Sequence, residues 1–153
     1  MNAVDRFTAA AAEVGLTPAV QRFPEGTRTA ADAAAAVGCE VGQIVKSLIF
    51  SVDGAPILIL TSGANQVDTE LVGEYLGASL EKADAALVRE STGFAIGGTP
   101  PLGHATPLRT LLDQDLLTHD EVWAAAGTPD TCFPIEPREL ASITEAEVLA
   151  VRN

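Results

Sequence analysis

Two apolar segments joined by Asp53-Gly54 constrain the fold of this chain more than any other feature of its sequence. Ile44–Val52 (IVKSLIFSV) is rich in β-branched residues, and Pro56–Thr61 (PILILT) follows shortly after the Asp-Gly pair. Asp-Gly between two such segments is typical of a two-residue hairpin turn, because both central residues of that turn need positive φ angles. We therefore expect an antiparallel hairpin within the main sheet.

Helix signals occur on both sides of this hairpin. After Asn2, which can cap a helix, apolar residues recur with a 3.6-residue period, and Gly15 and Pro18 end the pattern. Further start and stop signals predict helices from Thr29 to Gly38, from Asp68 to Leu76 and from Asp84 to Arg89. Pro137 begins another short helix, and the capping box Thr144-x-x-Glu147 predicts a last helix at the C-terminus.

Short apolar segments between these helices predict additional strands at Ala19–Phe23, Leu108–Leu112, Glu121–Ala125 and Thr131–Ile135. Helices interrupt the hairpins instead of alternating strictly with strands. This order favours an α+β fold with a mixed, barrel-like sheet surrounded by helices, and it argues against a doubly wound fold. A chain of 153 residues favours one domain, residues 1–153. We expect Trp123 and Phe133, on two of these strands, to lie in the core.

The charge of the chain restricts how it can meet a nucleic acid. The formal net charge is −12, and the only lysines are Lys46 and Lys82, with seven arginines scattered along the sequence. A protein that grips a long phosphate backbone needs several cations in one patch. DNA is therefore not expected as a partner. Contact with RNA should be confined to a short end, with weak binding to tRNA alone and a shallow salt dependence.

Several classes of protein are disfavoured. No apolar run approaches the ~20 residues that span a bilayer, and no signal peptide is evident. Cys39 and Cys132 form no CxxC pair, so we expect a cytoplasmic protein without a membrane partner. His104 and His119 lack metal-ligand spacing, and there is no GxSxG motif, so no metal or cofactor is expected.

Lys46 is the most unusual residue of the predicted hairpin, because its neighbours in the strand are apolar on both faces. A lysine there costs desolvation energy unless its ammonium reaches water, a partner or an anion. Two interpretations stay open. The residue is either a lysine at a sheet edge, or a cation held in a cleft to bind a carbonyl, phosphate or carboxylate.

A glycine-rich segment, Gly93 to His104 (GFAIGGTPPLGH), is the second unusual feature. Around Gly97, Gly98 and Pro101, consecutive main-chain amides could form a nest for an oxyanion or a phosphate. The alternative is an ordinary tight loop. The segment matches neither the P-loop nor the GxGxxG fingerprint.

Two further groups of polar residues have simpler explanations. The segment Thr61 to Asn65 (TSGAN) follows the second strand of the hairpin and is either a pocket wall or a plain turn. Asp113, Asp115, Asp120 and Glu121 cluster in the sequence, and we expect them to form a solvated face.

The order of several segments is similar to that of one known family. QIVKSLIF, TSGAN, STGFAIGGTPPLG, VWAAAG and PIEPRELASIT occur in this order, from about Thr29 to the C-terminus. The series resembles the YbaK/EbsC and prolyl-tRNA-synthetase-associated domain family. A strand lysine followed about fifty residues later by a GxxxP turn is more specific than either feature alone. The resemblance implies a compact α+β domain that hydrolyses mischarged tRNA in trans, mostly alanyl- or cysteinyl-tRNA(Pro).

The resemblance also implies site residues. The catalytic residues would be Lys46, Gly97, Gly98 and Pro101. The substrate pocket would include Phe23, Thr29, Thr61, Ser62, Gly63, Thr99, Leu102, Gly103, His104 and Cys132, with Phe23 and Leu102 limiting its volume. Amides of the Gly97 turn would bind the ester carbonyl oxygen, and Lys46 would hold the terminal phosphate or orient the ribose. No general base is evident, so a ribose hydroxyl and a bound water would complete the hydrolysis.

The implied partners are the 3′ end of an aminoacyl-tRNA and, as a candidate, prolyl-tRNA synthetase. Three alternatives stay open. The chain could bind a nucleotide or an aminoacyl compound without turnover, it could be an interaction module that meets a synthetase through its acidic surface, or it could be an unrelated hydrolase of free esters or amides.

Overall fold

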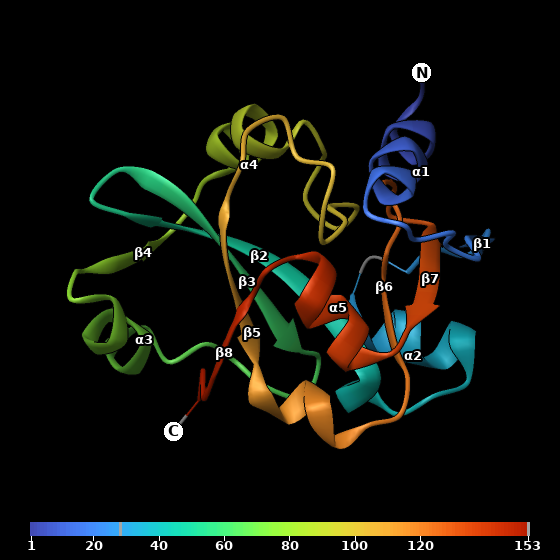
Figure 1. Ribbon diagram of the computed structural model, residues 1–153. Helices are drawn as coiled ribbons and strands as arrows, with labels where there is room; N and C mark the ends of the chain where they lie inside the picture. Colours follow the sequence, from blue (N-terminus) through green and yellow to red (C-terminus); the bar gives the residue numbers. More distant parts are fainter. Residues whose placement is uncertain (28, 153) are drawn as a thin grey trace.

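The computed structural model describes residues 1–27 and 29–152, which fold into one mixed sheet with helices around it (Figure 1). The strands are β1 (Gln21–Arg22), β2 (Ile44–Val52), β3 (Ala55–Ser62), β4 (Leu80–Lys82), β5 (Arg109–Asp113), β6 (Val122–Ala125), β7 (Thr131–Ile135) and β8 (Glu147–Leu149). The helices are α1 (Ala3–Glu13), α2 (Ala30–Val37), α3 (Thr69–Leu76), α4 (Ala85–Thr92) and α5 (Pro137–Ile143), with short 3-10 helices at Val41–Gln43 and Gln114–Thr118.

The hairpin and four of the helix starts agree with the prediction from sequence. Asp53 and Gly54 have φ angles of 51° and 84°, so both central residues of the turn are left-handed, and Val52 pairs with Ala55. The predicted caps Asn2, Thr29, Asp68 and Asp84 each accept a hydrogen bond from a main-chain N–H in the first turn of their helix.

The sheet has the order β1-β7-β6-β2-β3-β5-β8, and β4 pairs with one end of β2. The pairs β2–β6, β3–β5 and β5–β8 are parallel, whereas β1–β7, β6–β7, β2–β3 and β2–β4 are antiparallel. In the described part of the chain β1 and β8 do not pair with each other, so the sheet is open and does not close into a barrel. The predicted α+β class with a mixed sheet is confirmed.

Alternate residues of β2 and β3 face two separate hydrophobic clusters. Val45 and Ile49 of β2 belong to the larger cluster, which contains the fully buried Phe7 of α1. Phe50 of β2 belongs to the smaller one, with the fully buried Val72 of α3. Because both faces of this hairpin are covered, its apolar side chains are buried on either side, and a polar side chain within it is exceptional.

The predicted C-terminal helix is wrong. Thr144 is the C-cap residue that follows α5 rather than the start of a new helix, and its hydroxyl donates to the Leu140 carbonyl at 2.7 Å. Glu147 begins β8, which pairs in parallel with β5. Its carboxylate accepts two hydrogen bonds from Arg109, at 2.7 and 2.8 Å, and one from the Tyr75 hydroxyl at 2.8 Å. These long-range contacts outweigh the local capping signal.

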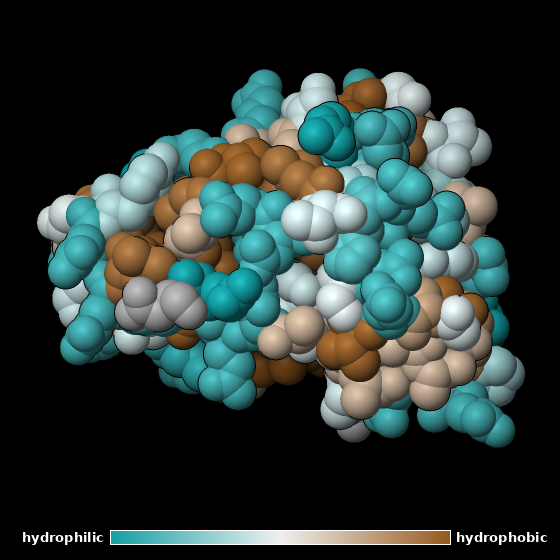
Figure 2. Space-filling view, turned by 90° about the horizontal axis from the view of Figure 1, so that it is seen from below, coloured by the Kyte–Doolittle hydropathy of each residue, from teal (hydrophilic) through white to brown (hydrophobic). Residues whose placement is uncertain are grey.

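Other boundaries differ less. Helix α4 continues to Thr92, three residues past its predicted end at Arg89, and the predicted strand Ala19–Phe23 contains only the short β1. On the face seen in Figure 2, hydrophobic side chains reach the surface in separate patches between hydrophilic ones. None of the helices in the described residues has the length and apolar character needed to cross a membrane.

Candidate functional site

The site forms at a gap along one edge of β2. The other edge pairs with β3 over residues 45–52, but on this edge β6 pairs only with residues 44–45 and β4 only with residues 50–52. The Ile49 carbonyl accepts a hydrogen bond from the Ala83 N–H at 3.2 Å. Because main-chain groups alternate between the two edges of a strand, the N–H and C=O of Ser47 point to this same edge, within the gap.

A cavity of about 340 Å³ opens at this gap, and Lys46 and Gly97 both line it. The strand lysine and the glycine-rich turn therefore meet at one hollow. The other lining residues are Thr27, Thr29, Ala30, Ala33, Ile44, Val45, Ser47, Leu48, Ile96, Thr99, Trp123, Ala124, Ala125 and Cys132. The walls are mostly small and apolar, and Lys46 is the one charged residue that the structure places among them.

Lys46 is half-buried, and its ammonium donates a hydrogen bond to the main-chain carbonyl of Asn65. Burial lowers the pKa of the ammonium, and the nearby Asp113 carboxylate partly offsets this. A lysine has three N–H donors, so two donors are left beyond the bond to Asn65. The ammonium is thus fixed in place by one contact and retains the capacity to bind an oxygen of a ligand.

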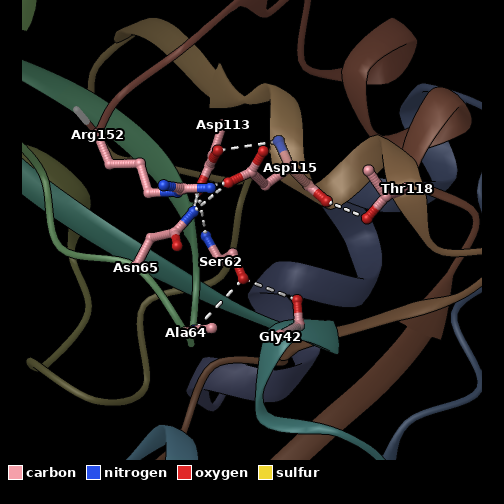
Figure 3. Close-up of polar contacts among 8 residues, drawn as sticks. All are labelled: Gly42, Ser62, Ala64, Asn65, Asp113, Asp115, Thr118 and Arg152. Carbon is pink, nitrogen blue, oxygen red and sulfur yellow. Dashed lines mark hydrogen bonds and ion pairs between the residues drawn. The ribbon is translucent and has the colours of Figure 1, made fainter.

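A buried polar network holds Asn65 (Figure 3). Asp113 is fully buried, and its carboxylate accepts hydrogen bonds from the Ser62 N–H at 3.0 Å, the Asn65 side-chain amide at 2.8 Å and the Asp115 N–H at 3.0 Å. Asp115 accepts hydrogen bonds from the Asn65 amide and from Arg152, both at 2.8 Å. The network fixes the turn whose carbonyl anchors Lys46.

This network corrects one prediction from sequence. The expectation of a solvated face is wrong for Asp113, which is 0% exposed, although Asp120 and Glu121 are exposed as predicted. The signal in the sequence was the position of Asp113 directly after Leu111 and Leu112, which are buried in β5. A carboxylate at the end of such a strand needs donors, and the TSGAN turn supplies them.

Three residues of that turn support it without lining the cavity. Thr61 is fully buried in β3, and the Ser62 hydroxyl donates to the Gly42 carbonyl at 2.9 Å. A Cβ atom on Gly63 would lie 2.5 Å from the Val41 carbonyl oxygen, so only glycine fits there. In the described structure these residues shape the turn behind Lys46, whereas the sequence had placed them in the substrate pocket.

The Gly97 turn offers fewer free amides than its sequence suggests. Gly97 has a φ angle of 88°, which favours glycine. The Gly98 N–H already donates to the Ala95 carbonyl at 3.0 Å, and a Cβ on Gly98 would lie 2.8 Å from Thr128 Cα. Among the described residues, no acceptor is found for the N–H groups of Gly97 and Thr99. Gly98 thus permits close packing, and Gly97 and Thr99 keep the available donors.

Of the predicted pocket residues, Thr29, Thr99 and Cys132 line the cavity. Burial raises the pKa of the Cys132 thiol, and the hydrogen bond between its Sγ and Thr27 Oγ1, 3.4 Å apart, offsets this in part by stabilising the thiolate. A thiol with a raised pKa is a poor nucleophile near neutral pH. Cys132 therefore forms part of the cavity wall and does not supply a reactive thiolate.

The remaining predicted residues lie away from this cavity. Phe23, Pro101, Leu102, Gly103 and His104 are absent from its described lining. Leu102 packs against the larger core cluster, and a Cβ on Gly103 would lie 3.1 Å from the Ala10 side chain of α1. The His104 ring is hydrogen-bonded to the Pro100 carbonyl at 2.8 Å, and burial lowers its pKa. Leu102, Gly103 and His104 therefore stabilise the loop by contacts outside the cavity.

Most of the described lining residues were not predicted as site residues from the sequence, and three of them are notable. Trp123, expected in the core, is only partly buried and lines the cavity, so that expectation needs correction. Ile96 is 60% exposed beside Gly97. The Ser47 hydroxyl oxygen is buried and lacks a hydrogen-bond partner among the described residues. No local pattern distinguishes these residues from ordinary strand and loop positions.

Comparisons with known proteins agree on one family. The family model described as aminoacyl-tRNA editing domain matches residues 24–143. A solved structure of a candidate trans-editing enzyme for prolyl tRNA synthetase is 45% identical, with a TM-score of 0.95, over 100% of this chain and 98% of that one. YwhH of Bacillus subtilis, which is uncharacterised, is 29% identical over 84% of this chain and 83% of its own length. The proline–tRNA ligase of Maridesulfovibrio salexigens is 32% identical over 74% of this chain, which corresponds to only 20% of the ligase.

Proposed function

Because this chain belongs to the aminoacyl-tRNA editing domain family, we propose that it hydrolyses the ester of wrongly aminoacylated tRNA in trans. The family match confirms the resemblance that the order of sequence motifs predicts. The observation that supports the proposed activity is the single cavity lined by the Lys46 ammonium and by the Gly97 turn. A cation and free main-chain amides at one hollow suit an ester whose carbonyl becomes an oxyanion during hydrolysis.

In the proposed complex the amino acid lies in the 340 Å³ cavity and its ester lies at the gap beside Lys46. The free N–H groups of Gly97 and Thr99 are the donors for the developing oxyanion. Lys46 binds the ribose or the terminal phosphate. Each correctly placed oxyanion donor contributes about 2.7–4 kcal/mol to lowering the barrier.

The reaction needs water and the substrate's own hydroxyl. Water adds to the ester carbonyl to give a tetrahedral oxyanion, and the bond from carbon to the ribose oxygen then breaks. That oxygen takes up a proton, so the products are the free amino acid and a tRNA with an intact terminal ribose. Among the described lining residues there is no carboxylate or histidine that could act as a general base, and the raised pKa of Cys132 disfavours a thiolate. We therefore assign the proton transfers to the neighbouring ribose hydroxyl and a bound water.

The walls of the cavity favour a small amino acid. Ala30, Ala33, Ala124 and Ala125 contribute much of the lining, and no charged side chain in the described lining faces the substrate other than Lys46. Such a site excludes larger side chains by clash more readily than it rejects smaller ones. Alanine and cysteine carried by tRNA(Pro) are the proposed substrates, with prolyl-tRNA synthetase as the proposed source of the mischarged product.

A deacylation panel tests this proposal. The wild-type protein should release alanine or cysteine from tRNA(Pro) faster than it releases proline, whereas Lys46→Ala should be inactive. Arg138→Ala removes a cation from α5, outside the cavity, and should keep wild-type rates. The proposal fails if none of the alanyl-, cysteinyl-, seryl- or prolyl-tRNAs is hydrolysed, or if Lys46→Ala deacylates at the rate of the wild type.

A further inference from the structure

Helix α1 precedes the part of the chain that matches the family model, and the proposed chemistry gives it no role. Its Phe7 is fully buried in the larger core cluster, so the helix is fixed to the rest of the fold. The helix also packs against the glycine-rich segment from Gly93 to His104, which contains the Gly97 turn (Figure 1). These contacts connect α1 to the candidate site.

The glycine-rich segment is a loop whose two ends are tied together at the C-terminal end of α4. The Ala105 N–H donates to the Thr92 carbonyl at 3.0 Å, and the Thr106 N–H donates to the Ser91 carbonyl at 3.1 Å. The Gly97 turn lies near the middle of this loop, away from these two hydrogen bonds. The position of its main-chain amides therefore depends on how firmly the ends of the loop are held.

Arg6 of α1 holds the first end of the loop. Its Nη2 donates a hydrogen bond to the Gly93 carbonyl at 2.8 Å, and its Cζ lies 4.7 Å from the centroid of the buried Phe94 ring. Gly93 is the left-handed C-cap of α4, with a φ angle of 78°. A guanidinium is attracted to the face of an aromatic ring and is a strong donor to a main-chain oxygen. One side chain thus fixes the first two residues of the loop.

The same helix packs closely against the second end of the loop and against the turn between β6 and β7. A Cβ on Gly103 would lie 3.1 Å from the Ala10 Cβ, and a Cβ on Gly127 would lie 2.8 Å from the Ala3 carbonyl oxygen. Gly127 directly precedes the residue on which Gly98 packs. Helix α1 therefore contacts both ends of the loop and the surface beneath its middle.

We propose that α1 belongs to the site, with Arg6 as a positioning residue for the Gly97 turn. Arg6 is absent from the described lining of the cavity, so it acts through the loop and not on the substrate. The catalytic consequence rests on the proposed function, in which the N–H groups of Gly97 and Thr99 bind the oxyanion. Such donors work only when they are preorganised, and a misplacement of about 1 Å can cost about 100-fold in rate.

Arg6→Ala tests the inference, because it removes both contacts at once. Arg6 is exposed and alanine favours helix, so the variant should fold with a Tm near that of the wild type. In NMR relaxation measurements on the free protein, the amide order parameters of Gly97 and Thr99 should fall from about 0.85 toward about 0.6. The kcat for deacylation should fall at least about tenfold with KM unchanged, because the oxyanion forms only in the transition state.

Two further variants separate positioning from a general loss of charge. Arg6→Lys keeps a cation near Phe94 and a donor for the Gly93 carbonyl, so it should restore most of the order parameters and most of kcat. Arg138→Ala removes the same charge from α5 and should behave like the wild type. Wild-type order parameters or a wild-type kcat in Arg6→Ala, a higher KM with kcat unchanged, no rescue by lysine, or an equal loss in Arg138→Ala would each overturn the inference.

The order parameters also separate this inference from the proposed activity, since they are measured without substrate. If they fall in Arg6→Ala and recover in Arg6→Lys, but the wild type hydrolyses no aminoacyl-tRNA, Arg6 still positions the loop and the hydrolase proposal falls. If the wild type is active and Arg6→Ala matches it in both kcat and order parameters, the hydrolase proposal stands and the role of Arg6 falls.

Discussion

Replacing Asp113 with asparagine should weaken the fold and slow deacylation together. One carboxylate oxygen of Asp113 accepts hydrogen bonds from the Ser62 N–H and the Asn65 amide, and the other accepts from the Asp115 N–H. An asparagine side chain keeps only one oxygen, and its NH₂ group would face one of these donors. At least one buried N–H then loses its acceptor.

The expected magnitude follows from burial. A buried polar group left without a partner costs about 1–3 kcal/mol, and Asp113 is 0% exposed, so we expect a loss of about 2 kcal/mol in the free energy of unfolding. For a domain of this size that loss lowers Tm by roughly 4–8 °C. Asn65 also anchors Lys46, so a shift of this turn should reduce the deacylation rate by at least about tenfold.

Urea unfolding and single-turnover deacylation, both at 25 °C, measure the two effects. Asp115→Asn is the matched control, because its side chain is 33% exposed, its ion pair with Arg152 is worth at most about 1 kcal/mol, and the remaining side-chain oxygen can still accept the hydrogen bond from Asn65. The reasoning is refuted if Asp113→Asn is as stable as Asp115→Asn, or if it is destabilised while its deacylation rate stays at the wild-type value.

Two further predictions concern the loop and the sheet edge. Gly98→Ala should slow deacylation at least about tenfold, because the new Cβ would lie 2.8 Å from Thr128 Cα and must displace the turn. Gly42→Ala, whose new Cβ would have the end of the His119 side chain as its nearest contact at 3.2 Å, should keep its activity, and equal rates in the two variants would contradict this role of Gly98. Arg109, followed by Tyr75, lowers the pKa of Glu147 from 4.5 to about 2, so the folded-state value lies below the unfolded one. This contribution to stability is therefore complete above pH 4.5 and is lost as the pH falls toward 2, where the Tm values of Glu147→Gln and the wild type should converge. Because 37% of the Glu147 side chain is exposed, the difference at pH 7 should be at most about 1 kcal/mol, and a difference that persists at pH 2 would refute the assignment.

The features predicted well from sequence are those that depend on contacts between residues close together in the chain. The Asp53-Gly54 turn and the caps at Asn2, Thr29 and Asp68 depend on residues at most three positions away. Their geometry is therefore specified by short segments, whatever the rest of the chain does.

The failures have long-range causes. Glu147 meets the local requirements of a helix start, but its partner Arg109 lies 38 positions earlier and holds it in a strand. In the sequence Asp113 resembles a surface carboxylate, because one of its hydrogen-bond donors, the N–H of Ser62, lies 51 positions away. The sequence also identifies Lys46 and Gly97 as unusual, but only the tertiary structure shows that Trp123 lines the same cavity.

The most direct test is the single-turnover deacylation rate of Lys46→Met on the preferred mischarged tRNA. Methionine retains most of the side-chain volume but removes the cation, whose burial already lowers its pKa. We expect a rate at least about 100-fold below that of the wild type. The free energy of unfolding should change by no more than about 1 kcal/mol. The variant loses the hydrogen bond from Lys46 to Asn65, but it also no longer has to remove a charged ammonium from water on folding. A folded variant that deacylates at the wild-type rate would contradict the proposal that this ammonium holds the ribose or the terminal phosphate of the substrate during hydrolysis.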